Sequence, residues 1–274
     1  MLRKVFLIEP ASRATKAYLK KAVRFFSSKK IAVECWCRDQ FFEGRWHHSY
    51  LSAPDKVRFE ALVKAFKSDA DLVVCVRGGY GSVRLLKRIK KPINSKFLLG
   101  FSDVSALQLS GKIKNSIHGS WEWLKIPQNW ETLKSILAQK HFSLRLKSRL
   151  KLAAKVIASN LSILCSLLGT PFLGIPENDF ILILEDTNEP LYRIDRMIFQ
   201  VVNSHFLKKC KGILLGDFDY KGKKYSYNIL EFILKEAGFL GKIGRFPIGH
   251  MGGFIVPQFW ILDLRHSRAT FLPA

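Results

Sequence analysis

The stretch "ADLVVCVRGGYGSVRLLKRIKKPINSKFLLGFSD", residues 70–103, carries the clearest pattern in this chain. A near-continuous apolar run ends in two glycines, apolar residues at helical spacing follow in 81–91, and a second apolar run fills 96–103. Such runs are typical of strands buried on both faces, and the order strand, helix, strand favours parallel pairing. We therefore predict a parallel sheet with helices on its faces.

The same alternation extends toward the N-terminus. Residues 4–12 and 31–37 are predicted strands, and residues 15–30 and 55–69 have the apolar spacing of helices. Functional groups in such sheets gather at the carboxyl ends of the strands. The turns that follow the strands are therefore where we look for chemistry.

A second unit follows a polar and basic stretch. We expect domains at 1–140 and 156–274, joined by a linker at 141–155. In the second domain we predict helices at 192–207 and 226–238, and strands at 180–188, 211–219 and 259–273.

The composition is that of a globular protein with a strong positive charge. The formal charge is +23, and residues 1–150 hold +19 of it. A nucleic-acid surface, attraction of a small anionic substrate, or a generally basic proteome would each explain this excess. The basic clusters lack the interleaved aromatic residues of a base-stacking module, so we do not expect nucleic acid as a partner.

Three further features favour a cytoplasmic protein without a membrane or metal partner. The N-terminal apolar run, Val5 to Ile8, is too short for a secretory signal, and no later run reaches the roughly 20 residues of a spanning helix. The five cysteines are scattered, and the Cys35–Cys37 pair has no second pair to complete a zinc site. We expect buried free thiols.

The glycine-rich turn 78–81 follows the strand of 70–77. Gly78, Gly79 and Gly81 would let backbone amides approach a ligand. The alternative is a tight turn without a ligand. The spacing matches neither of the phosphate-binding patterns GxGxxG and GxxxxGK[ST].

Ser102 and Asp103 follow the next strand. A serine at a sharp strand-to-helix turn presents its hydroxyl, and the amide of the following residue points to where an oxyanion would form. The alternative is that Ser102 or Asp103 caps the helix that begins there. Both roles are compatible.

A carboxylate and an imidazole with suitable surroundings occur later in the chain. Glu185 ends an apolar strand, with Asp186 and Glu189 as rivals that alternatively are solvated or paired with arginines. His250 lies in a Pro- and Gly-rich loop, and His118 is the next candidate. Serine, imidazole and carboxylate together form the minimal set for nucleophilic catalysis.

Five segments in order resemble the LD-carboxypeptidase family of serine peptidases, which includes the microcin-immunity peptidases. The segments are "RGGYGSVRLL", "LLGFSDVSALQL", "SNLSILCSLLGTPF", "LEDTNEPLYRIDRMI" and "FPIGH". The resemblance implies an N-terminal Rossmann-like domain, a smaller C-terminal α/β domain and a site between them.

The same resemblance implies roles for named residues. Ser102 is the expected nucleophile, Glu185 the carboxylate and His250 the base, with the amides of Gly79 and Asp103 as oxyanion donors. It also implies a homodimer that needs no metal or cofactor and removes the terminal D-alanine from murein tetrapeptides in cytoplasmic cell-wall recycling. The substrate is then a small anionic peptide.

The chain also departs from the family pattern. Ser120 stands where relatives often have proline, and Trp121 and Trp123 follow it, so we expect these tryptophans to reshape the pocket. The segment after His250 is also unusual. Two alternatives stay open: a microcin-immunity-like peptidase that cleaves a peptidyl-nucleotide, and a basic binding protein without catalytic activity.

Overall fold

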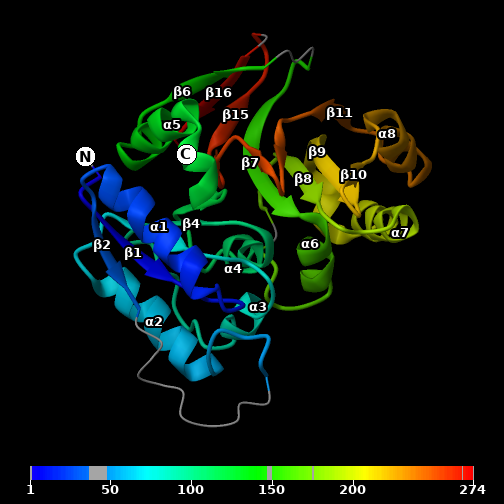
Figure 1. The fold of residues 1–274 in the computed structure, drawn as a ribbon. Helices are drawn as coiled ribbons and strands as arrows, with labels where there is room; N and C mark the ends of the chain where they lie inside the picture. Colours follow the sequence, from blue (N-terminus) through cyan, green and yellow to red (C-terminus); the bar gives the residue numbers. More distant parts are fainter. Residues whose placement is uncertain (1, 37–47, 147–149, 175, 267, 274) are drawn as a thin grey trace.

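Two β-sheets form the framework of the protein in the computed structural model (Figure 1). The structure describes residues 2–36, 48–146, 150–174, 176–266 and 268–273. One sheet has six strands in the order β14-β5-β4-β3-β1-β2, and the other has eight, in the order β10-β9-β8-β7-β15-β16-β6 with β11 beside β9. The mixed α/β class with parallel strands, predicted from the sequence, is confirmed.

The first sheet is built mainly from the N-terminal half. Strands β1 to β5 pair in parallel, because helices return the chain to the same end of the sheet each time. Its strands are β1 (Lys4–Ile8), β2 (Ala32–Cys35), β3 (Leu72–Cys75), β4 (Phe97–Gly100), β5 (Ser116–His118) and β14 (Val256–Pro257). The helices of this half are α1 (Lys16–Ser28), α2 (Asp55–Lys67), α3 (Ser82–Leu85), η1 (Ser102–Val104), α4 (Ser105–Leu109), η2 (Trp121–Lys125) and α5 (Pro127–Leu137).

The second sheet has a parallel centre, β7-β8-β9-β11, and an antiparallel edge. Its strands are β6 (Phe142–Arg145), β7 (Ala153–Asn160), β8 (Phe180–Asp186), β9 (Cys210–Tyr220), β10 (Lys223–Lys224), β11 (Lys242–Arg245), β15 (Ile261–Asp263) and β16 (Arg268–Leu272). Its helices are α6 (Leu161–Leu167), α7 (Leu191–Val202), η3 (His205–Lys209) and α8 (Tyr227–Glu236). A two-stranded ribbon, β12 (Ile248–Gly249) with β13 (Gly252–Gly253), lies beside them.

Continuous apolar sequence produces the buried strands. Every residue of β3, β4 and β8 is buried, as expected for strands covered on both faces. The short helix α4 contacts α6 and β7, and one hydrophobic cluster contains Leu107 of α4 together with Ile157 of β7. The two units therefore share a packed contact directly behind the turn that carries Ser102.

Several boundaries differ from those predicted. The helix expected over 81–91 covers only Ser82–Leu85, and the segment expected as one strand at 259–273 is the hairpin β15–β16. The expected linker 141–155 contains β6 and the start of β7, both in the second sheet. The domain boundaries themselves stay a prediction.

One strand from the C-terminal part of the chain belongs to the first sheet. β14 follows His250 yet pairs with β5 of the first sheet, through Val256 opposite His118. β6, from the segment expected as a linker, pairs with β16 at the edge of the second sheet. The segment after His250 is therefore tied by β14 to the first sheet.

The structure bears on two expectations from the sequence, the lack of a membrane span and the state of the cysteines. In the described ranges, no helix is long and apolar enough to cross a membrane. Cys75, Cys165 and Cys210 are free thiols, of which Cys75 and Cys210 are buried. Cys37 lies outside the described residues.

Candidate active site

Ser102 occupies a strained turn at the end of β4. Its φ is +59°, in the left-handed region that non-glycine residues seldom adopt, and η1 begins at this residue. The neighbouring turn holds it closely, since a Cβ on Gly78 would lie 2.8 Å from the Ser102 Cβ. This is the geometry of a nucleophile elbow, in which backbone strain presents the hydroxyl.

The glycine-rich turn 78–81 packs against the loop after β1. Gly79 has a φ of +102°, and a Cβ there would lie 2.3 Å from Ser12 Oγ, so only glycine fits. Ser12 Oγ in turn accepts the Tyr80 amide at 3.0 Å. Among the described residues, no acceptor receives the backbone amide of Gly79 or of Asp103. Both amides are therefore available to a ligand.

The carboxylate of Asp103 has a different structural role from the one expected of a helix cap. It accepts the backbone amide of Ser82 at 2.7 Å, and neither η1 nor α4 has a side-chain cap at its own start. Burial raises the pKa of Asp103, while the donors from Ser82 and Gly81 oppose that rise. Asp103 thus ties the elbow to the glycine-rich turn.

Glu185 and His250 come together although 65 residues separate them. His250 Nδ1 lies 3.4 Å from Glu185 Oε2, and Glu185 is fully buried at the end of β8. Asn160 Nδ2 donates to the other carboxylate oxygen at 3.2 Å. The His250 ring also packs on Phe101, with centroids 4.5 Å apart. Glu185 is therefore placed to orient the ring through Nδ1.

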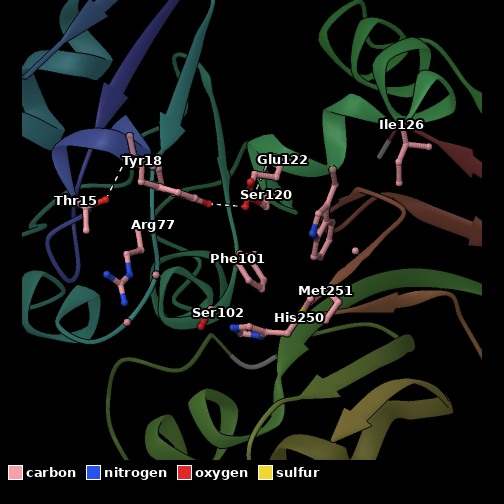
Figure 2. Close-up of a pocket in the computed structure, with 16 residues that line it drawn as sticks. Thr15, Tyr18, Arg77, Phe101, Ser102, Ser120, Glu122, Ile126, His250 and Met251 are labelled. Atoms are coloured by element: carbon pink, nitrogen blue, oxygen red, sulfur yellow. Dashed lines mark hydrogen bonds between the residues drawn. The ribbon is translucent and has the colours of Figure 1, made fainter. Parts of the chain in front are cut away.

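Figure 2 shows Ser102 and His250 pointing toward one another at the floor of the pocket. Both residues lie in the described part of the chain, and no hydrogen bond joins the Ser102 hydroxyl to the His250 ring there. Catalytic hydrogen bonds of this type commonly tighten only in the complex with substrate.

The rival acids face elsewhere. Asp186 accepts the amides of Ser162 at 2.7 Å and Thr187 at 2.8 Å, and burial beside Glu185 raises its pKa to about 7. Glu189 pairs with Arg193 at 3.4 Å. Of the three acids considered, only Glu185 is in contact with His250.

His118, the rival imidazole, is sealed in the core. Its side chain is fully buried, and burial lowers its pKa to about 3. It does not line the cavity around Ser102, and its Nδ1 lies 3.5 Å from Ser105 Oγ. A neutral, enclosed ring of this kind contributes to packing.

The cavity above Ser102 has a volume of about 760 Å³. It lies between the turns of the first sheet and the ribbon β12–β13, and its walls carry Arg77, Glu122 and Tyr18 (Figure 2). Trp123 lines it as expected. Trp121 does not: it is fully buried and donates from Nε1 to the Val76 carbonyl at 3.2 Å, so its predicted effect on the pocket is at most indirect.

Two residues of this region were not predicted from the sequence. Asn160 ends β7, caps α6 by accepting the Ile163 amide, and also donates to Glu185. Arg58 is buried and donates to the carbonyls of Ala53 and Gly81 at 2.9 Å. An asparagine at a strand-to-helix junction is a recognisable signal, whereas an arginine within an amphipathic helix is not.

The described part of the chain contains no group of three or more His, Cys, Asp or Glu residues placed to hold a metal ion.

Comparison with known proteins identifies the family. A sequence model of the LD-carboxypeptidase N-terminal domain matches residues 5–119, and that of the LD-carboxypeptidase C-terminal domain matches residues 153–257. The chain belongs to the LD-carboxypeptidase family. A relative from Synechocystis sp. is 32% identical over 268 residues, which is 89% of this chain and 88% of that protein.

Other relatives agree at lower coverage or identity. A Rickettsia conorii relative is 32% identical over 191 residues, 62% of this chain, and the match spans only 60% of that relative. The murein tetrapeptide carboxypeptidase of Pseudomonas aeruginosa is 29% identical, over 85% of this LD-carboxypeptidase-family chain and 82% of its own length.

Solved structures share the fold over nearly the whole chain. The muramoyltetrapeptide carboxypeptidase from Oxalobacter formigenes has a TM-score of 0.79 at 20% identity, covering 99% of this chain and all of that one. The MccF structure with glutamyl sulfamoyl guanosine has a TM-score of 0.78 at 17% identity, covering 99% and 96%. This family member therefore shares its fold with both the muramoyltetrapeptide carboxypeptidase and MccF.

Proposed function

We propose that this protein is a serine carboxypeptidase that removes the terminal D-alanine from murein tetrapeptides. The observation that carries the proposal is that Ser102 and His250 line one cavity, while the buried Glu185 lies 3.4 Å from the far side of the His250 ring. A hydroxyl, an imidazole and a buried carboxylate in this order are sufficient for acyl transfer.

The proposed reaction has two halves. Ser102 Oγ bonds to the scissile carbonyl carbon as its proton passes to His250, which then protonates the D-alanine nitrogen as the C–N bond breaks. Water, deprotonated by His250, bonds to the acyl carbon, and the bond to Ser102 Oγ breaks as His250 returns the proton to that oxygen and the shortened peptide leaves. Glu185 stabilises the imidazolium in each half, and the amides of Gly79 and Asp103 hold the developing oxyanion.

Three observations support a murein peptide as substrate. The Pseudomonas aeruginosa and Oxalobacter formigenes proteins carry that specificity in their names. The cavity of about 760 Å³ is within the size range of small-molecule sites. Murein peptides carry several carboxylates, and the +19 charge of residues 1–150 would attract them from a distance.

Mass spectrometry of the purified protein incubated with a murein tetrapeptide tests the proposal. We expect loss of one alanine residue, with D-alanine as the released product. Ser102→Ala should abolish release while the peptide still binds. Release of D-alanine by Ser102→Ala at the parent rate would contradict the assignment of the nucleophile.

The fold similarity to MccF favours a second candidate function, that of a peptidase that cleaves an amide bond in a peptidyl-nucleotide. A direct comparison of a sulfamoyl nucleotide conjugate with the tetrapeptide, by kcat/KM, separates the two. A catalytically silent binding protein, the third candidate, would leave Ser102 unlabelled by a fluorophosphonate.

We also propose a homodimer acting in the cytoplasm in cell-wall recycling. Aromatic side chains at Tyr192 and Phe199 on α7 and Phe232 on α8 are between 57% and 65% exposed, which suits a contact surface. Size-exclusion chromatography with light scattering tests the dimer, and cell fractionation tests the location.

A further inference from the structure

Arg77 supplies the positive charge of the cavity wall. It follows β3 and immediately precedes Gly78. Among the described residues that line the cavity, only Arg77 and His250 are basic and only Glu122 is acidic. Since His250 is engaged with Glu185, Arg77 is the cation left to meet a ligand.

The hydrogen bonds of Arg77 leave most of its guanidinium available. Its Nη1 donates to the Arg13 carbonyl at 3.1 Å, and no carboxylate in the described ranges pairs with it. Two nearby arginines differ, because Arg58 and Arg84 both bind Asp55, at 2.6 and 2.9 Å. The Arg13 carbonyl thus fixes one edge of Arg77 and leaves the other donors unpaired by any acid.

The position of Arg77 relative to the nucleophile suits a carboxylate near the scissile bond. Gly78 is so close to Ser102 that a Cβ on it would touch the serine at 2.8 Å, which brings the neighbouring Arg77 to the same rim. In the view of Figure 2, Ser102 lies between the side chains of Arg77 and His250. In a peptide, only one nitrogen and one carbon separate the terminal carboxylate from the scissile carbonyl.

The opposite wall repels such a group. Glu122 accepts the Tyr18 hydroxyl at 2.7 Å and holds its charge at the other side of the cavity. A substrate carboxylate that avoids Glu122 is directed toward Arg77, whose planar guanidinium matches a carboxylate with two parallel hydrogen bonds.

We propose that Arg77 binds the terminal carboxylate of the departing residue and thereby restricts the site to the last bond of a peptide. The inference rests on the proposed function, with Ser102 as nucleophile. It assigns the substrate requirement, a free C-terminal carboxylate, to one side chain.

The test compares two substrates, a tetrapeptide that ends in D-alanine and the same peptide that ends in D-alanine amide. We expect the wild-type protein to cleave the free acid with a higher kcat/KM, by roughly 10- to 100-fold, the range of a charge-assisted pair. Arg77→Gln should lose this factor on the acid and keep the rate on the amide. Arg77→Lys should retain part of the preference, because a point charge replaces the bidentate fork.

Lys87→Gln is the matched control, since it removes an exposed positive charge that does not line the cavity. The preference for the acid should be unchanged in it. Undiminished amide cleavage by Arg77→Gln shows that the variant is folded.

The outcomes separate the two proposals. An acid preference that persists in Arg77→Gln overturns the role of Arg77 and leaves the peptidase proposal intact. A wild-type protein that cleaves neither peptide overturns the proposed function and the role of Arg77 with it.

Discussion

Glu185→Gln removes one charge from the proposed triad and keeps the shape of the side chain. The carboxylate oxygen lies 3.4 Å from His250 Nδ1 and has no exposure to solvent. Two unit charges about 4 Å apart interact by about 4 kcal/mol at an effective dielectric of about 20. In the proposed reaction the imidazolium forms as the serine proton is transferred, so this energy would stabilise the transition state and not the ground state.

At about 1.4 kcal/mol for each factor of ten, the loss corresponds to a fall in kcat of roughly 10³-fold. KM should change little, because the interaction that is lost forms during the reaction. The assay is D-alanine release from a murein tetrapeptide under saturating and subsaturating conditions. Glu189→Gln, which removes an acid that pairs with Arg193 away from the ring, is the control and should keep the parent rate.

A kcat for Glu185→Gln within tenfold of the parent, with Ser102→Ala inactive, would refute this reasoning. It would mean that the imidazolium does not depend on the buried carboxylate.

Three further predictions concern the surroundings of the site. Gly78→Ala should place a Cβ 2.8 Å from that of Ser102 and displace the nucleophile, with a loss of about 10²-fold in kcat; a parent-like rate in the tetrapeptide assay would contradict this. The pKa of Asp186 is raised to about 7, so the folded protein holds a proton that the unfolded chain releases near pH 4. This group therefore lowers the unfolding free energy as pH rises from about 4 to 7, by up to about 1.4 kcal/mol per pH unit. The unfolding free energy of Asp186→Asn, measured with urea at pH 5 and pH 7, should decline less than that of the wild type, and equal declines would contradict the burial argument. Arg58→Leu leaves the carbonyls of Pro10, Ala53 and Gly81 without their buried donor and removes one of the two arginines that bind Asp55. It should cost about 3 to 5 kcal/mol of unfolding free energy, so a loss under about 1 kcal/mol would show that the network is dispensable.

The features that sequence patterns predicted correctly are local ones. The apolar runs in 70–77 and 96–103 became β3 and β4, because a strand buried on both faces needs apolar residues at every position. The sharp turn at Ser102 was also predicted, since the apolar run ends there in a glycine, a phenylalanine and then a serine at the start of a helix.

The features that were missed depend on distant partners. β7 is a central strand, yet its first residues, Ala153 to Lys155, are partly polar and were interpreted as linker. The helix after Gly81 ends at Leu85, although apolar residues continue at helical spacing to Ile89. Lys112 donates to the carbonyls of Leu86 and Ile89, a tertiary contact that replaces further helical hydrogen bonds.

By itself the sequence determined the α/β class, the buried strands and the place of the serine turn, because each depends on residues adjacent in the chain. It proposed Glu185 and His250 only as candidates among rivals. The tertiary structure alone decided that Glu185 and not Asp186 meets the imidazole, and that His118 is sealed in the core. The two acids are adjacent and share the Asn160 amide, so the chain alone does not separate them; which one meets the imidazole is set by packing between residues far apart in the sequence.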